Sequence, residues 1–245
     1  MSALCGLDAP LALCPNGNTF GECSHCKVRA LSVCSALEPD ELDALDKLAR
    51  HVTFDKRQTL FSQGEVSDAV YNITSGSVRV FKLLPDGRRQ IIGFALPGDF
   101  LGLTLSERNA FCADALTATA ACQFSRATFS GLLDAKPHLL RRLHDMASHE
   151  LTLAQEQMVI LGRRTAEEKV VAFLLGLRKR WSRIDGSTVH VPLPMGRQDI
   201  GDFLGLTVET VSRMMTKLER EKALVIVPDG VRLLDMPRLM AMAET

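Results

Sequence analysis

The C-terminal third of the sequence restricts the fold most, because two amphipathic stretches there flank a Gly-containing turn and a hairpin pattern follows. The spacing of apolar residues predicts a short helix over residues 197–204 and a longer one over residues 208–222. A β-hairpin is expected over residues 224–234, turning at Asp229 and Gly230, a pair that suits a two-residue type I′ loop. Helix, turn, helix and hairpin in this order predict a winged helix-turn-helix domain.

The longer of these helices separates into two faces. Its apolar face, which we expect in the core, follows a 3, 4, 3 spacing and consists of Val208, Val211, Met215 and Leu218. Glu209, Ser212 and Arg213 stand at i, i+3 and i+4 near the start of the opposite face, where a recognition helix meets base edges. Arg can donate to guanine, Glu can accept from cytosine, and Ser can contact base or phosphate. We therefore predict that these three side chains read double-stranded DNA.

Basic residues around this face are candidates for sequence-independent phosphate contacts. They are Arg197, Lys217, Arg220 and Lys222. The alternative for the exposed face is an ion pair between Glu209 and Arg213 on a solvated helix, worth only about 0.3–0.5 kcal/mol. The helix-turn-helix and wing pattern favours the DNA-reading interpretation.

The charge distribution agrees with a polyanionic partner at the C-terminal end. The formal net charge is +0, but residues 1–162 carry 15 Lys and Arg against 18 Asp and Glu, whereas residues 163–245 carry 14 against 11. No apolar run approaches the length of a membrane-spanning helix, which needs about 18 residues. Residues 1–15 lack the basic start and uninterrupted apolar stretch of a secretory signal, so we expect a cytoplasmic protein with reduced thiols and no membrane partner.

Regularly spaced glycines predict a β-rich domain before the helices. Gly64, Gly76, Gly87 and Gly98 lie 12, 11 and 11 residues apart, with strand-like stretches between them. Those stretches are residues 69–73, 77–83 and 90–95. Short strands at this spacing favour a small antiparallel barrel or jelly roll, which we expect to end near Phe129. Arg88 and Arg89 are interpreted as a charged hairpin tip.

Helices are expected on both sides of this roll. A short amphipathic helix is predicted from Pro39 to about His51, and another from Thr165, as N-cap, to Trp181. Residues 137–161 predict one long helix with a near-heptad apolar stripe. The stripe consists of Leu143, Ala147, Leu151, Ala154, Met158 and Leu161. We expect it to form a homodimer seam, although packing on the roll of the same chain would account for part of this face.

The fold class expected from these patterns is α+β, with an N-terminal antiparallel β-roll, a dimerisation helix and a C-terminal winged helix-turn-helix. The predicted organisation is a flexible leader (1–22), a cysteine cluster loop (23–36), the β-roll sensor domain (37–135), the dimerisation helix (136–162) and the DNA-binding domain (163–245).

Three cysteines within 12 residues form a second candidate functional site, besides the DNA-reading residues. Cys23, Cys26 and Cys34 are separated by two and seven residues, a spacing with which one loop can wrap a metal centre. From spacing alone, Cys14 would complete a structural zinc site, whereas Cys112 or Cys122 would tie the loop to the roll. Zinc, an iron-sulfur cluster and reactive thiols all remain open at this point. The sequence contains no nucleophile elbow, dinucleotide fingerprint or P-loop, so an enzyme, or a small-molecule-binding roll with an attached interaction domain, is disfavoured.

Three segments together resemble the cyclic-AMP receptor protein superfamily, and specifically its oxygen-sensing FNR branch. They are residues 199–213, which include the Glu-x-x-Ser-Arg triplet, residues 165–174 and residues 90–99. The resemblance implies a homodimeric activator that binds palindromes of TTGAT-type half-sites and recruits RNA polymerase.

The same resemblance implies a 4Fe-4S cluster with four cysteine ligands. Three would be Cys23, Cys26 and Cys34, and the fourth Cys122, because residues 121–129 resemble the family segment around that ligand. Where cyclic-AMP binders place an Arg-Ser pair for the phosphate, this chain has Cys112 and Ala113, and Leu103 replaces the acidic residue that meets the ribose. The resemblance therefore implies that no cyclic nucleotide is bound.

Overall fold

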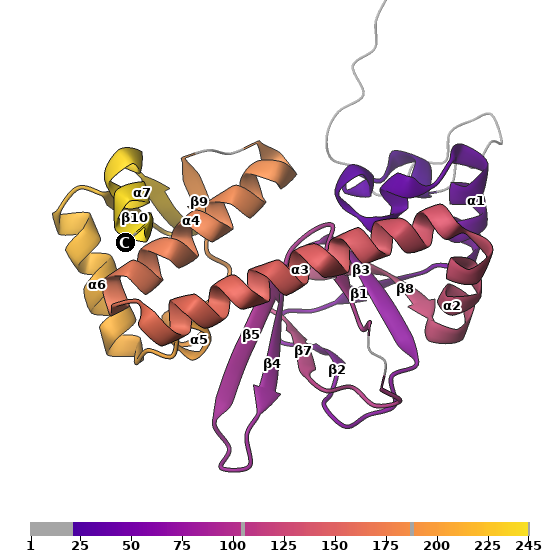
Figure 1. Ribbon diagram of the computed structural model, residues 1–245, viewed down its shortest axis with the longest axis horizontal. Coiled ribbons are helices and arrows are strands. Elements are labelled where there is room, and N and C mark those ends of the chain that lie inside the picture. The colour runs from indigo at the N-terminus through magenta and orange to yellow at the C-terminus, as the bar shows by residue number, and fades with distance from the viewer. Residues whose placement is uncertain (1–21, 104–105, 187–188, 245) are drawn as a thin grey trace, which may run out of the picture.

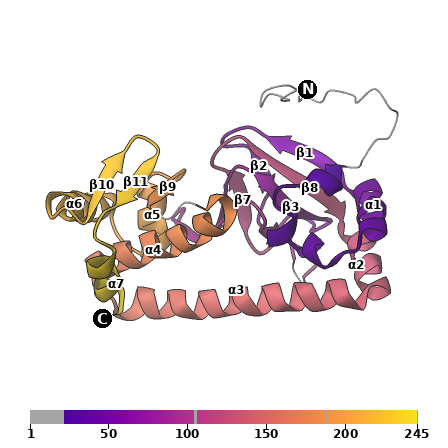
Figure 2. The ribbon, with the colours of Figure 1, turned by 90° about the horizontal axis from the view of Figure 1, so that it is seen from above.

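A computed structural model describes residues 22–103, 106–186 and 189–244, so the expected leader lies almost entirely outside the described residues. A β-roll and a C-terminal domain lie at opposite ends of one long helix, α3 (Pro137–Arg163) (Figure 1). Seen from above, α3 runs along one side of both parts (Figure 2). The expected α+β architecture is confirmed.

The roll consists of two four-stranded antiparallel sheets. The first has the order β1 (Arg50–Phe54), β8 (Thr119–Ser125), β3 (Ala69–Ser75), β6 (Phe100–Leu101). The second has the order β2 (Thr59–Phe61), β7 (Cys112–Ala115), β4 (Val78–Leu83), β5 (Arg89–Ala95). Buried residues of both sheets, including Ile73, Val78 and Ala113, share one core. The predicted jelly roll is therefore confirmed.

Positive φ angles explain the regular glycines. Gly64, Gly76, Gly87 and Gly98 all have φ between 82° and 98°, a region that favours glycine. At Gly76 an added Cβ would also lie 2.4 Å from the carbonyl oxygen of Ala118. These positions are turns, as the spacing predicted.

The cysteine cluster loop and the first helices cover one end of the roll. Three short 3-10 turns, η1 (Glu22–His25), η2 (Arg29–Leu31) and η3 (Val33–Ala36), precede α1 (Pro39–Leu48). The prediction that this helix continues to about His51 was wrong, because residues from Arg50 onward pair with β8. Helix α2 (Arg126–Ala135) was not predicted, although its N-cap Ser125 accepts a hydrogen bond from the Thr128 amide, which is an ordinary helix-start signal.

Helix α3 carries two apolar stripes rather than one. The inner stripe is buried or half-buried and consists of Leu139, Leu143, Met146, Leu153 and Ile160. The outer stripe is exposed and consists of Leu140, Ala147, Leu151, Ala154, Met158 and Leu161. The predicted seam therefore mixed the two stripes, because Leu143 packs in the core of its own chain while the other five residues lie outside.

The C-terminal domain has the expected winged helix-turn-helix order. Its elements are α4 (Ala166–Asp185), β9 (His190–Pro192), α5 (Arg197–Leu204), α6 (Val208–Arg220), β10 (Leu224–Val227), β11 (Gly230–Leu233) and α7 (Met236–Glu244). Thr165 caps α4, as predicted, and the structure adds a reciprocal capping box with Glu168. Helix α7 was not predicted.

The wing turns one residue earlier than expected. Val227 pairs with Gly230, so the two loop residues are Pro228 and Asp229, neither of which has a positive φ. The prediction of a type I′ turn at Asp229 and Gly230 was wrong. Gly230 serves a different need, because an added Cβ would lie 2.1 Å from the carbonyl oxygen of Val191 on β9.

Ion pairs join the roll to the helix-turn-helix. Arg89, predicted at a hairpin tip, instead begins β5 and pairs with Asp199 and Asp202 of α5 at 2.7 Å each. Arg79 of β4 also pairs with Asp199, at 3.0 Å. Only Arg88 lies at the tip, where it pairs with Asp86. Among the described residues, no helix is long and apolar enough to cross a membrane.

Candidate cofactor site and DNA-binding surface

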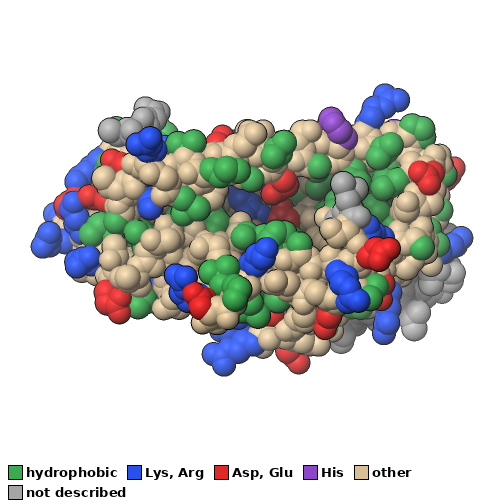
Figure 3. Space-filling model, turned by 60° about the horizontal axis from the view of Figure 1, so that its bottom comes forward, with side chains coloured by type: hydrophobic (Ala, Val, Ile, Leu, Met, Phe, Trp, Pro, Cys, Tyr) green, Lys and Arg blue, Asp and Glu red, His purple; other side chains and the backbone are tan. Residues whose placement is uncertain are grey.

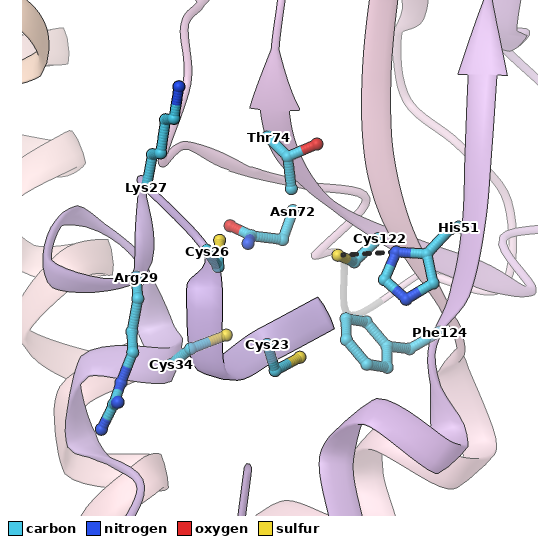
Figure 4. A pocket seen from close by; sticks show the side chains of 10 residues that line it. All are labelled: Cys23, Cys26, Lys27, Arg29, Cys34, His51, Asn72, Thr74, Cys122 and Phe124. Atoms are coloured by element: carbon cyan, nitrogen blue, oxygen red, sulfur yellow. Dashed lines mark hydrogen bonds between the residues drawn. The ribbon is translucent and has the colours of Figure 1, made fainter. Parts of the chain in front are cut away.

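Four cysteines line one cavity of about 210 Å³ at the end of the roll (Figure 4). Cys23 lies in η1, Cys26 follows that turn, Cys34 lies in η3 and Cys122 lies in β8. Segments about ninety residues apart in the chain are thus brought together, because the 3-10 turns lie against the sheet that contains β8. None of the five described cysteines forms a disulfide.

Local structure fixes two of the loop cysteines. Ser32 caps η3, and its hydroxyl accepts a hydrogen bond from the Cys34 amide. Cys23 and Cys34 are buried and belong to one core with Leu139 and Leu143 of α3. The loop is therefore packed directly on the inner stripe.

Burial controls the protonation of these thiols. Burial raises the pKa of Cys23 well above its usual range, and the Asp46 carboxylate, which accepts a hydrogen bond from the thiol, raises it further. The pKa of Cys34 is also raised, mainly by burial. In this state neither thiol is a ready nucleophile, which disfavours a role as reactive thiols.

Cys122 lies between two polar neighbours on adjacent strands. The register places His51 of β1 on one side of it and Asn72 of β3 on the other. The sulfur of Cys122 lies 3.8 Å from Nδ1 of His51, whose Nε2 lies 3.3 Å from Asp46. Both neighbours line the cavity, together with Lys27 and Arg29 of the loop.

The donor set suits an iron-sulfur cluster. Four cysteine thiolates are the ordinary ligands of a 4Fe-4S cluster, and here four cysteine side chains line one cavity. A zinc ion needs all its sulfur ligands about 2.3 Å from one centre. In the described part of the chain, no group of three or more His, Cys, Asp or Glu side chains is placed so that it could hold a metal ion, and this finding does not distinguish zinc from a cluster. Cys14, the predicted fourth ligand for zinc, lies outside the described residues.

Cys112, the rival fourth ligand, lies elsewhere. It is buried in β7, where its sulfur accepts a hydrogen bond from the Gln63 amide at 3.2 Å. It joins the core shared by the roll and the C-terminal domain rather than the cysteine cavity.

The start of α6 presents the three predicted base-reading residues. Val211, Met215 and Leu218 are buried, as the spacing predicted, and Val208 is half-buried. On the other face Glu209 and Arg213 are exposed and Ser212 is half-buried. Hydrogen bonds from its own amide and from the Thr207 hydroxyl lower the pKa of Glu209, which keeps it an anionic acceptor.

Arg213 does not close the ion pair considered as the alternative. Its guanidinium instead donates to the hydroxyl of Thr210 at 3.2 Å. The structure leaves both Glu209 and Arg213 exposed near the start of α6.

Of the four predicted phosphate contacts, Arg220 and Lys222 are exposed, whereas Lys217 and Arg197 are half-buried. Lys217 reaches back to Glu167 of α4, with 2.5 Å between Nζ and Oε2, and this partner raises its pKa. Arg197, the first residue of α5, is half-buried, and burial lowers its pKa. Lys and Arg side chains nevertheless gather at the end of the molecule that the C-terminal domain forms (Figure 3).

A winged helix-turn-helix joined by a long helix to a β-roll defines a class of DNA-binding transcription regulators. Residues 51–136 match the family described as a cyclic nucleotide-binding domain, and residues 193–224 match the crp family of bacterial regulatory proteins. The chain belongs to the CRP/FNR family of transcription regulators.

Relatives are similar over nearly their whole length. The transcriptional activatory protein AadR of Rhodopseudomonas palustris is 55% identical over 90% of this chain and 92% of its own. The nitrogen fixation regulation protein FixK of Bradyrhizobium diazoefficiens is 51% identical over 94% of this chain and 95% of its own. The solved structure of FixK2 from Bradyrhizobium japonicum is 35% identical, covers 79% of this chain and 96% of its own, and has a TM-score of 0.74.

Proposed function

We propose that this chain is a transcription activator that responds to oxygen or redox state through a 4Fe-4S cluster held by Cys23, Cys26, Cys34 and Cys122. It binds TTGAT-type palindromes as a homodimer and recruits RNA polymerase, in a cytoplasm that keeps its thiols reduced. The observation that carries the proposal is the shared cavity of the four cysteines. When bound, the cluster would supply an oxygen-labile connection between the loop and β8.

The packing of the loop supports a route from this cavity to the dimer. Cys23 and Cys34 share a core with Leu139 and Leu143 at the start of α3. Anything that fixes or releases the loop therefore acts on the inner stripe, and the outer stripe lies on the same helix. The second sheet of the roll and the C-terminal domain are joined by the ion pairs of Arg79 and Arg89, so the helix-turn-helix is held against the roll at the same time.

Anaerobic reconstitution of single Cys→Ser variants tests the cluster. Cys122→Ser should lose the broad visible absorption of an iron-sulfur cluster, whereas the matched variant Cys112→Ser, also at a buried strand position, should retain it. Air should bleach the band of the parent protein. Stoichiometric zinc in protein purified without oxygen, or loss of the cluster from Cys112→Ser alone, would contradict the ligand set.

DNA reading is tested on α6. Arg213→Ala should cost about 1–3 kcal/mol of binding and relax the preference at the guanine of the half-site. Lys217→Ala should weaken all sequences alike, and because Lys217 already pairs with Glu167 its loss should be the smaller one. Equal losses on specific and random duplexes for Arg213→Ala would sink the assignment of a base contact.

The proposal gives cyclic nucleotides no role. At the positions of the family's Arg-Ser pair, Cys112 and Ala113 are both buried and offer no cationic or hydroxyl side chain to a phosphate. Addition of cyclic AMP should leave the melting temperature unchanged, and a concentration-dependent increase would contradict this part.

A further inference from the structure

Asn72 is a polar side chain in an apolar setting. It lies on β3 between the buried residues Tyr71 and Ile73, and only 1% of it is exposed. Its side-chain oxygen is buried and has no hydrogen-bond partner among the described residues. A buried polar atom without a partner is costly, so an observed one calls for an explanation.

The sheet register places this amide at the cysteine cavity. Asn72 pairs directly with Cys122 of β8, and cross-strand neighbours present their side chains on the same face. Asn72 lines the cavity, and Figure 4 shows its amide pointing toward Cys26 and away from Cys122. Thr74, two residues along the same strand, directs its hydroxyl away from the cysteines in this view.

We propose that the carboxamide of Asn72 donates a hydrogen bond to a sulfur atom of the iron-sulfur cluster and sets its reduction potential. The inference rests on the proposed function, because it concerns the same cavity. Asn72 is a positioning residue here, since it is not a ligand and acts through the sulfur that it contacts.

The chemistry of the group fits this role. A cluster with four thiolate ligands has electron-rich sulfurs, and hydrogen bonds to these sulfurs are among the factors that set its potential. An amide carries two donor hydrogens, and a half turn about its last bond exchanges oxygen and nitrogen. The donor can therefore face the cavity while the oxygen turns toward the sheet. Donors stabilise the more negative, reduced state and so raise the potential.

Other polar groups at the cavity cannot substitute for Asn72 in the same way. Lys27 and Arg29 are carried by the loop, and Arg29 already donates to the carbonyl of Leu37 at 3.2 Å. His51 lies near both Cys122 and Asp46. Asn72 is thus a neutral donor group that the rigid sheet, rather than the loop, supplies to the cavity.

The test compares Asn72→Leu with the control Thr74→Val, and each replacement keeps the branched shape of the parent side chain without its polar atoms. Asn72→Leu should still take up the cluster, but its one-electron reduction equilibrium should shift about tenfold toward the oxidised form, a fall of about 59 mV. Anaerobic redox titration of the reconstituted full-length protein measures this, and Thr74→Val should titrate like the parent. The cluster-free Asn72→Leu protein should melt at the same or a higher temperature, because the buried side-chain oxygen without a partner is gone.

Two measurements on Asn72→Leu separate this role from a structural one: the melting temperature of the cluster-free protein and the reduction potential of the cluster-bound protein. A lower melting temperature of the cluster-free variant with an unchanged potential would overturn the inference and leave the proposed function intact. If Asn72→Leu fails to take up the cluster, Asn72→Gln, which retains the amide, should restore uptake, and failure of that rescue overturns the inference. If the parent protein takes up no iron-sulfur cluster, or holds zinc instead, both proposals fall.

Discussion

The inner and outer stripes of α3 have similar side chains and opposite environments. Leu139 is 0% exposed, whereas its neighbour Leu140 is 50% exposed. Further along, Leu151 is 59% and Met158 65% exposed, on the face that no part of the described chain covers. The inner stripe thus packs on the cysteine cluster loop, on the roll and, at Ile160, on the core that includes the C-terminal domain, while the outer stripe is left for another surface.

The two stripes allow one helix to serve two purposes. Burial of the inner stripe makes α3 part of the folded chain, because each large apolar side chain removed from water contributes about 1.5–3 kcal/mol. The outer stripe has a near-heptad spacing, which is typical of helices that pair with a second copy. Family members act as dimers, and this face offers the surface that such pairing requires.

The largest effect is expected on the inner stripe. Leu139→Ala should lower the free energy of unfolding by about 2–5 kcal/mol, because it removes a fully buried side chain and leaves a cavity. Leu140→Ala, one residue away on the outer stripe, should change it by no more than about 0.5 kcal/mol. Urea unfolding of the two variants measures the difference. Equal losses would show that the two stripes are not distinct.

The second-largest effect is expected on dimerisation through the outer stripe. Met158→Asp should leave the stability of the single chain within about 0.5 kcal/mol of the parent but raise the dimer dissociation constant at least about tenfold, or about 1.4 kcal/mol. A carboxylate at a seam would be buried without a partner when two copies meet. Sedimentation equilibrium measures the constant.

Thr152→Asp is the matched control for that experiment. Thr152 is exposed on α3 but lies off the outer stripe, so the same added charge should leave dimerisation unchanged. If Thr152→Asp weakens the dimer as much as Met158→Asp, the seam lies on a different face of α3.

Most of the fold could be predicted because its signals are local. Gly64, Gly76 and Gly98 mark turns by their backbone conformation, and Thr165 marks a helix start. The predictions that failed depend on distant partners. Gly230 was interpreted as a turn residue, but a glycine is needed there because β9 approaches its backbone closely. Likewise Arg89 looked like a hairpin tip because Asp202, its partner, lies more than a hundred residues away.

The residues of the candidate site also differ in whether local sequence signals reveal them. The loop cysteines could be found from their spacing, and Cys122 only from a resemblance, because β8 reaches the cavity through sheet pairing. Asn72 was missed altogether. A single Asn in a buried strand, opposite a cysteine in the register, is a signal that appears only once the register is known.

The smallest effect should come from the link between the cysteine end and the start of α3. Glu41 of α1 pairs with Lys136 at 2.7 Å and with His138 at 2.9 Å. The Lys136 contact, the Glu38 amide and His138 lower the pKa of Glu41 to about 2.

Because the folded-state pKa of Glu41 lies below its unfolded value, the stabilising contribution of this carboxylate is complete above about pH 4.5 and is lost as the pH falls toward 2. The stability difference between the parent and Glu41→Gln should therefore be full at pH 6 and shrink between pH 4.5 and 2, as urea unfolding at each pH would measure. Asp43→Asn, at an exposed position on the same helix, is the control. A difference that stays constant over this pH range would mean that Glu41 contributes through packing rather than through its charge, and that the inner stripe alone attaches the cysteine end to α3.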